Sequence, residues 1–172
     1  MNIATVYWLV PAKAERELFR EIIRILAKEL DAPRFDPHVT IVVPRANGQS
    51  PGEVLRYLKT APLRMSVDRV AFASRFTKTL FVRLHSNRQF EKLAADLGRI
   101  THARPNRPID PHVSLLYQDV PTAIKKELAS AIELPLRYVH FDSIKAVRCR
   151  LPVKTRADVE RWRVMAERRL SG

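Results

Sequence analysis

The sequence contains a single cysteine and has no hydrophobic run long enough to cross a membrane. Cys149 alone cannot form an internal disulfide or a cysteine-based metal cluster, and its apolar and basic neighbours predict a buried or half-buried thiol on a strand. No apolar stretch approaches the roughly 20 residues that span a bilayer. Residues 1–11 lack the basic start and the small-residue cleavage site of a signal peptide. We therefore expect a cytoplasmic protein with no membrane partner.

Acidic residues are also few. The chain has 31 Lys and Arg against 18 Asp and Glu, a formal net charge of +13. This excess favours polyanionic partners, RNA or nucleotides before membrane surfaces, although a basic surface can also serve solubility alone. With 172 residues and 46% hydrophobic composition, the chain is an ordinary globular sequence long enough for one domain or two small lobes.

Low-complexity segments and linkers are absent, and a seven-residue motif occurs twice. Residues 36–42 read Asp-Pro-His-Val-Thr-Ile-Val, and residues 110–116 read Asp-Pro-His-Val-Ser-Leu-Leu. The proline biases the preceding Asp toward extended backbone, and the residues after it favour a strand. Alternate side chains of a strand share a face, so each copy places an imidazole beside a hydroxyl. A lone histidine at a strand start is usually structural, and it is the repetition that indicates a site.

The rest of the chain divides into short elements around these motifs. The hydrophobic pattern predicts strands over 3–10, 38–43, 63–73, 79–85, 112–117, 136–142, 144–151 and 162–169, helices over 13–30, 53–60, 88–100 and from 121 to about 132, and a turn over 156–160. Both halves share the order strand, helix, His strand, short helix, strand. A Pro-Leu-Arg sequence also follows each motif at nearly the same distance, at 62–64 and 135–137.

This repeat predicts how the chain is organised. We expect a single bilobal domain, 1–172, built from duplicated lobes at roughly 3–73 and 79–170. An approximate two-fold axis between such lobes would bring the two His strands face to face across a central cleft.

The two imidazole–hydroxyl pairs suit a particular chemistry. Two histidines in one pocket fit a reaction that removes one proton and delivers another, because their unperturbed pKa is near 6.5. The hydroxyls of Thr40 and Ser114 can donate hydrogen bonds to an anionic oxygen, with no metal or other cofactor required. A cyclic phosphodiester has two bridging oxygens to exchange and two non-bridging oxygens to hold. Such a substrate therefore fits His38, His112, Thr40 and Ser114.

On these motifs the chain resembles the 2H phosphoesterase superfamily, which includes the RNA 2′,3′-cyclic phosphodiesterases (formerly 2′-5′ RNA ligases). Residues 35–40 and 112–117 are most similar to the cyclic phosphodiesterases of plants and yeast, and residues 7–11 and 162–166 also resemble that branch. The resemblance implies an α+β fold, with two antiparallel sheets around a central cleft and helices packed outside.

The resemblance also implies an activity. It is the metal-independent opening of nucleoside 2′,3′-cyclic phosphates to 2′-phosphates, and in the plant branch of ADP-ribose 1″,2″-cyclic phosphate. By the same analogy His112 is the base that activates water, and His38 is the acid. Plant members carry cysteine pairs that a chain with Cys149 alone cannot form.

Other residues are weaker candidates. Tyr117 is a further substrate-binding candidate, although strict alternation from His112 favours a core position. Trp8 or Phe76 could stack on a base. Basic residues in loops beside the expected cleft could attract a phosphate chain: Arg45, Arg75, Lys78, Arg104 and Arg107. The remaining histidines have no partner motif and are predicted to be structural: His85, His102 and His140.

Three other interpretations stay open. A catalytically silent RNA-binding protein explains the charge but not the repeated pairs. A metallohydrolase could draw on Asp36 and Asp110, but the prolines after them indicate turns, and His-x-His and His-Glu-x-x-His spacings are absent. Ligation of RNA ends uses the same atoms in reverse. The sequence does not discriminate a mononucleotide, an RNA or tRNA end and a cyclic ADP-ribose phosphate, and it indicates neither a protein partner nor an oligomeric state.

Overall fold

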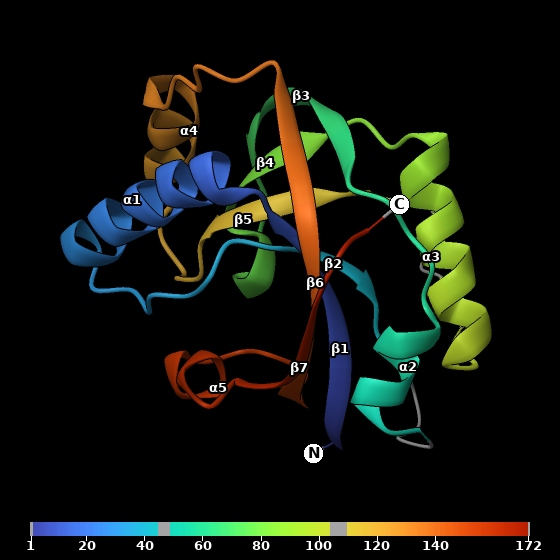
Figure 1. Cartoon of the computed structure of the whole chain (residues 1–172). Coiled ribbons are helices and arrows are strands. Elements are labelled where there is room, and N and C mark those ends of the chain that lie inside the picture. The colour runs from blue at the N-terminus through green and yellow to red at the C-terminus, as the bar shows by residue number, and fades with distance from the viewer. Residues whose placement is uncertain (1, 45–48, 104–109, 172) are drawn as a thin grey trace.

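The computed structural model describes residues 2–44, 49–103 and 110–171. Its elements in chain order are β1 (Asn2–Pro11), α1 (Lys13–Glu29), β2 (Val39–Val42), α2 (Pro51–Tyr57), β3 (Leu63–Phe72), the 3₁₀ turn η1 (Phe76–Lys78), β4 (Leu80–Leu84), α3 (Arg88–Ile100), β5 (His112–Leu116), α4 (Thr122–Ala131), β6 (Tyr138–Leu151), α5 (Arg156–Glu160) and β7 (Arg163–Arg169) (Figure 1). The predicted α+β class with antiparallel strands is confirmed.

The strands form one antiparallel seven-stranded arrangement in the order β2-β1-β6-β3-β4-β5, with β7 also paired to β6. The long strand β6 connects the two halves. Along one edge it pairs with β1, and along the other it pairs first with β3, from residue 138 to 141, and then with β7, from residue 143 to 148. The two strands predicted at 136–142 and 144–151 are therefore one strand. No Pro or Gly interrupts the chain between them, so the backbone continues without a turn.

The strand order is symmetric. If β1, β2 and β3 are matched with β4, β5 and β6, the order reads the same from either end. The third strand of each half pairs with the first strand of the other half: β3 lies beside β4, and β6 lies beside β1. The long helices are exchanged between the halves in the same way. Helix α1 packs on β5 of the second half, and α3 packs on β2 of the first half. In Figure 1, α1 and α4 accordingly lie on one side of the strands, and α2 and α3 on the other.

This arrangement brings the two motif strands together. β2 and β5 stand at opposite ends of the strand order, and they also contact each other. A flat sheet would hold its end strands far apart, so the strands must curl until the ends meet. The lobe boundaries near residues 73 and 79 remain a prediction from the sequence repeat.

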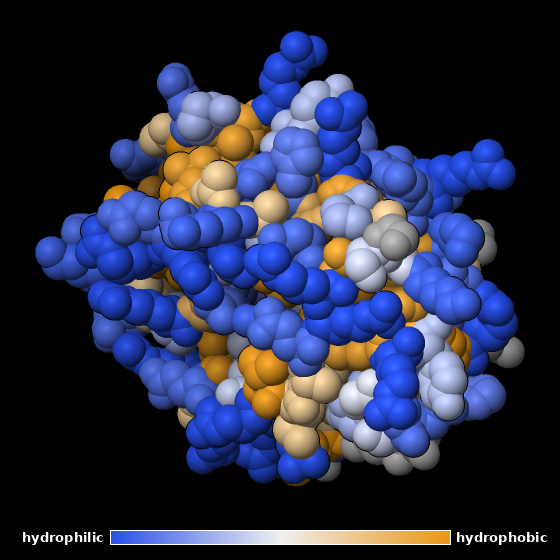
Figure 2. All heavy atoms as spheres, viewed as in Figure 1, coloured by the Kyte–Doolittle hydropathy of each residue, from blue (hydrophilic) through white to orange (hydrophobic). Residues whose placement is uncertain are grey.

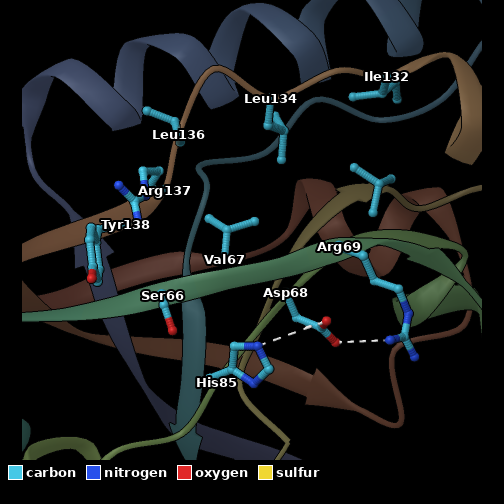
Figure 3. Close-up of a pocket in the computed structure, with 11 residues that line it drawn as sticks. Ser66, Val67, Asp68, Arg69, His85, Ile132, Leu134, Leu136, Arg137 and Tyr138 are labelled. Atoms are coloured by element: carbon cyan, nitrogen blue, oxygen red, sulfur yellow. Dashed lines mark hydrogen bonds and ion pairs between the residues drawn. The ribbon is translucent and has the colours of Figure 1, made fainter.

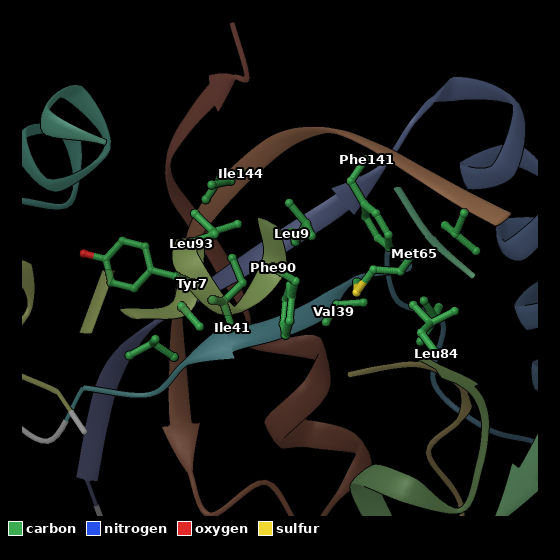
Figure 4. Close-up of a cluster of buried hydrophobic side chains, with 14 of the residues drawn as sticks. Tyr7, Leu9, Val39, Ile41, Met65, Leu84, Phe90, Leu93, Phe141 and Ile144 are labelled. Atoms are coloured by element: carbon green, nitrogen blue, oxygen red, sulfur yellow. The ribbon is translucent and has the colours of Figure 1, made fainter. Parts of the chain in front are cut away.

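The hydrophobic core lies where the two halves interleave. Figure 4 shows Leu9 of β1, Val39 of β2, Met65 of β3, Phe90 of α3 and Phe141 of β6 gathered in one cluster, and all of them are buried. These side chains come from segments far apart in the sequence. Their burial therefore ties the two halves of the chain into one core.

Polar side chains cover most of the face seen in Figure 2, with hydrophobic residues visible between them. None of the helices among the described residues is both long enough and apolar enough to span a bilayer.

Phe141 stands at the point where β6 meets both halves, opposite Pro11 of β1 and Leu63 of β3. We expect Phe141→Ala to lower the free energy of unfolding by about 3–5 kcal/mol, because it removes a fully buried ring and leaves a cavity. Urea denaturation measures this change. Val164→Ala on β7 is the control, since Val164 is 52% exposed, and should cost about 0.5 kcal/mol or less. Equal losses in both variants would contradict a shared core at Phe141.

Candidate active site

One cavity of about 780 Å³ is lined by both sequence motifs. Its walls come from β1, β2, β5, β6, α3, the η1 turn and the start of the β7 segment. All five predicted site residues line it: His38, Thr40, His112, Ser114 and Tyr117. The structure thus brings together two groups of residues that are more than seventy positions apart in the chain.

The two histidines are oriented by the same hydrogen bond. Nδ1 of His38 donates to the backbone carbonyl of Asp36 at 2.7 Å, and Nδ1 of His112 donates to the carbonyl of Asp110 at 2.8 Å. A carbonyl oxygen can only accept, so the proton of each neutral ring lies on Nδ1 and Nε2 is the acceptor. The proline between each Asp and His restricts the backbone that forms this bond. The Asp-Pro-His sequence therefore sets the tautomer of each ring.

The carboxylates of the same two aspartates hold the motifs to the rest of the protein. Asp36 accepts from Nη2 of Arg20 at 2.9 Å and from Nζ of Lys145 at 3.4 Å. Burial opposes ionisation of Asp36, but these cations together hold the pKa of its carboxyl below the ordinary value. Asp110 accepts a hydrogen bond from Nζ of Lys78 and forms an ion pair with Nε of Arg83 at 3.4 Å. Each motif is thus anchored by an ion pair next to its histidine.

These ion pairs bear on the metallohydrolase interpretation. Among residues 2–44, 49–103 and 110–171, no three His, Cys, Asp or Glu side chains are placed to share a metal ion. The carboxylates of Asp36 and Asp110 instead point to basic side chains.

The surroundings of the two rings differ strongly. His38 is 6% exposed and stacks on Trp8, with ring centroids 3.7 Å apart and planes 11° from parallel. Trp162 and Phe35 lie nearly perpendicular to it, at 5.8 and 6.4 Å. His112 is half-buried, contacts Phe81 edge to face at 5.3 Å, and lies near the cations that bind Asp110.

These surroundings lower the pKa of both rings. Burial lowers the pKa of His38 from 6.5 to about 4, and the charges of His112 and Lys145 add to this effect. Burial also lowers the pKa of His112, with a contribution from Lys78. In the free protein at pH 7 both imidazoles are therefore neutral.

The two hydroxyls are not equivalent. Thr40 is exposed in the cavity and lies opposite Trp8 in the β1–β2 register. Ser114 is buried, and its hydroxyl donates to the carbonyl of Thr77 at 3.0 Å. Thr40 can therefore donate to a ligand at once, whereas the hydroxyl of Ser114 must first rotate away from Thr77.

Tyr117 is both a buried residue and a cavity residue. Strict alternation would place it opposite His112, but β5 ends at Leu116 and the alternation ends with it. The ring stacks on Phe35 at 4.1 Å and lines the cavity. Burial raises the pKa of Tyr117, so its hydroxyl remains protonated.

The remaining candidates fall into three groups. Arg75 and Lys78 line the cavity, whereas Arg45, Arg104 and Arg107 lie outside the described residues. Trp8 lines the cavity, but one of its faces is already covered by His38; Phe76 stacks loosely on Tyr117 at 6.1 Å.

Two other residues of the cavity need comment. Cys149 is buried there as predicted, and burial raises the pKa of its thiol to about 12. Trp162 was not recognised from the sequence as a site residue. The alternation over 162–166 predicted only a strand and carried no sign that Trp162 would face His38.

The three other histidines lie outside this cavity. His140 on β6 is held by Glu15 of α1, with 2.6 Å between Nδ1 and the carboxylate. His102 is exposed, and His85 lines a second cavity of about 540 Å³. Figure 3 shows that second cavity, where Leu134 and Leu136 face Val67. It contains neither motif histidine.

Comparison with known proteins agrees with this geometry. No protein-family model matches the chain. A cyclic phosphodiesterase from Arabidopsis thaliana is 23% identical over 167 residues, which cover 92% of this chain and 91% of that protein.

Solved structures give the fold. E. coli LigT in complex with 3′-AMP superposes with a TM-score of 0.56 at 16% identity, covering 98% of this chain and 99% of LigT. The protein TT0787 of Thermus thermophilus has a TM-score of 0.60 at 14% identity, and 97% of each chain is covered. A structure described as a phosphoesterase also has a TM-score of 0.60, at 13% identity over both whole chains.

The chain therefore shares the fold of these solved phosphoesterase structures, and its resemblance to cyclic phosphodiesterases extends over nearly its whole length. Within that class the chain is similar in sequence to a plant cyclic phosphodiesterase over nearly its whole length. These comparisons support a phosphoesterase.

The burial of His38 predicts a pH-dependent stability. An unfolded histidine binds a proton below about pH 6.5, whereas folded His38 resists protonation until about pH 4. The stability that depends on neutral His38 is therefore intact above pH 6.5. As the pH falls toward 4, the free energy of unfolding decreases by up to about 3 kcal/mol. Urea denaturation of the wild type and of His38→Gln between pH 7 and 4 measures it. The wild type should lose more stability than His38→Gln, and exposed His85→Gln should behave as the wild type. Parallel curves for the wild type and His38→Gln would contradict the burial argument.

Proposed function

We propose that the protein hydrolyses a cyclic phosphodiester by acid–base catalysis with His38 and His112, without a metal ion. The substrate class is a 2′,3′-cyclic phosphate, on a nucleotide or an RNA end, or ADP-ribose 1″,2″-cyclic phosphate, and the product is the monoester. The observation that carries this proposal is the pair of identically tethered imidazoles lining one cavity, each with Nε2 left as the reactive nitrogen. The sequence similarity to a plant cyclic phosphodiesterase supports the same reaction.

The proposed reaction needs one proton removed and one delivered. One imidazole takes a proton from water through Nε2 as the water oxygen forms a new bond to phosphorus. The bond from phosphorus to one ribose oxygen breaks, and the other imidazole protonates that oxygen. Thr40 donates to a non-bridging oxygen, and so does Ser114 after its hydroxyl turns from Thr77. Arg75 and Lys78 add positive charge at the cavity.

The family resemblance implies that His112 is the base that activates water and that His38 is the acid that protonates the departing oxygen. An acid must begin protonated, and burial keeps His38 neutral in the free protein. The negative charge of a bound phosphate raises the pKa of a neighbouring imidazole. If His38 is the acid, it therefore takes up its proton together with the substrate. If His38 is instead the base, it is already neutral and ready to accept a proton at pH 7.

Replacement of either histidine should remove most activity. We expect His38→Ala and His112→Ala each to lower turnover of 2′,3′-cyclic AMP by at least about 100-fold, the usual contribution of one proton-transfer group. The assay is run in EDTA, where the wild type should keep its rate. His85→Ala is the control, because His85 lies outside the cavity. Wild-type rates in both motif variants would remove this mechanism, and loss of activity in EDTA would favour a metallohydrolase.

The pH dependence distinguishes the roles of the two rings. Since both pKa values are lowered, kcat/KM for the free enzyme should be bell-shaped with its maximum below pH 6.5. The kcat profile should lie at higher pH, because bound phosphate raises the pKa values. Removing the base abolishes the low-pH limb of the remaining activity, and removing the acid abolishes the high-pH limb. A maximum of kcat/KM above pH 8 would contradict two histidines with lowered pKa values.

A panel of substrates determines the substrate class. It comprises a cyclic mononucleotide, a short RNA with a 2′,3′-cyclic end and ADP-ribose 1″,2″-cyclic phosphate. Binding of the RNA with no product from any of the three would favour a non-catalytic RNA-binding protein. A joined RNA product would favour ligation.

A further inference from the structure

The C-terminal segment contributes a ring to the site that neither sequence motif contains. Trp162 lies between α5 and β7, and it lines the cavity with His38 and Tyr117. It contacts two separate stacks of rings. One stack is Trp8 with His38, and the other is Phe35 with Tyr117.

Trp162 stands nearly perpendicular to both stacks. Its plane makes 80° with His38 at 5.8 Å and 72° with Trp8 at 5.0 Å. It makes 84° with Tyr117 at 5.7 Å and 75° with Phe35 at 6.4 Å. Perpendicular contacts of this kind are favourable and directional for aromatic rings. Trp162 therefore closes the side of both stacks at once.

The indole N–H supports a role beyond filling space. Nε1 of Trp162 is buried and has no hydrogen-bond acceptor among the described residues. Burying such a donor costs about 1–3 kcal/mol. A Phe or Leu at this position would avoid that cost, but neither would reach both stacks as the larger indole does.

The position of Trp162 is itself well determined. Its backbone N–H donates to the carbonyl of Val159, which is buried. The α5 turn before it has a capping box, in which Thr155 and Asp158 satisfy each other's backbone groups. Arg156 ties this turn to Asp31 after α1, at 2.9 Å. The position of Trp162 is thus held mainly by hydrogen bonds within its own turn.

We propose that Trp162 is a positioning residue for His38: its indole holds the imidazole flat against Trp8 and keeps water away from it. This inference rests on the proposed function for its catalytic meaning, but the orientation and protonation of His38 can be measured without a substrate. The charged and titratable groups that face His38 are His112 from β5, Lys145 from β6 and Asp36, which binds Arg20 of α1. Trp162 adds no charge, so its effect on His38 is one of solvent exclusion.

Under this proposal the two motif histidines differ in their access to water and therefore in when they are protonated. His38 takes a proton only when the negative charge of a bound substrate compensates for the missing water. His112 is half-buried, and among the described residues the ring that contacts it is Phe81. Two residues that occupy equivalent places in the repeat are thereby given different proton affinities.

Titration of the histidine ring protons by NMR tests this proposal. The His38 signal is assigned with His38→Gln, and the wild type is compared with Trp162→Leu, Trp162→Phe and Val164→Ala. We expect Trp162→Leu to raise the pKa of His38 by about one unit or more toward 6.5, because water reaches the ring. Trp162→Phe keeps a perpendicular ring and should shift it by less than half as much. Exposed Val164→Ala in the same segment should leave it unchanged, and the His112 signal should move by less than the His38 signal in each Trp162 variant.

Two outcomes would overturn the proposal. One is a His38 titration in folded Trp162→Leu within about 0.3 units of the wild type. The other is an equal shift in Trp162→Phe, which would mean that any change at this position acts through general loosening. If Trp162→Leu does not fold, Trp162→Met replaces it, because Met fills a similar volume without a ring.

A kinetic arm distinguishes this proposal from the proposed function. If cyclic phosphates are hydrolysed, a limb of the kcat/KM profile should move in Trp162→Leu by the same amount as the NMR titration. If no cyclic phosphate is hydrolysed by the wild type, the proposed function fails, and the NMR result still decides whether Trp162 controls His38.

Discussion

The site depends on one hydrogen bond that is made twice, from an imidazole Nδ1 to the carbonyl of the aspartate two residues earlier. This bond selects the tautomer, so that Nε2 of each ring is the acceptor. It is local, and the proline between the two residues limits the backbone that can form it. Because it needs only three consecutive residues, the same arrangement could be encoded at two places in the chain.

A local bond is useful only if the peptide that bears it stays in place. The carboxylates of Asp36 and Asp110 meet this need through ion pairs with basic side chains of α1, β6, η1 and β4. Each aspartate thus has two tasks: its carbonyl orients the ring, and its carboxylate fixes the motif to neighbouring elements. This explains why both motifs keep an acidic residue although neither carboxylate is placed in a shared metal-binding group of the described residues.

The interleaved strands then place the two motifs in one cavity. β2 and β5 are the ends of the strand order, and the curled sheet brings them into contact. The symmetry of the backbone does not extend to the surroundings of the rings. Trp8, Phe35 and Trp162 surround His38, whereas His112 lies beside the ion pairs of Asp110. A symmetric fold therefore places the two rings in different surroundings, which suits a reaction that needs an acid and a base.

Most of the helices and strands could be predicted, because their periodic patterns are local. Each exception has a specific physical cause. The sequence predicts two strands, 136–142 and 144–151, where the structure has one, because β6 pairs with β1 along one edge and with β3 and then β7 along the other. Strict alternation places Tyr117 on the face opposite His112, but β5 ends one residue earlier, at Leu116. Trp162 lies in a segment of family resemblance, but its place in the site could not be predicted, because the rings that it contacts are distant in sequence.

The sequence by itself determined the two Asp-Pro-His motifs and the hydroxyl two residues after each imidazole, because both depend only on neighbouring residues. The repetition of the motif is likewise read directly from the sequence. The tertiary structure decided what surrounds each ring. Burial, stacking on Trp8, closure by Trp162 and the cations near His112 arise only when segments separated by tens to more than a hundred residues meet. The pKa of an imidazole depends on solvent access and on nearby charge, and neither is written in the order of its immediate neighbours.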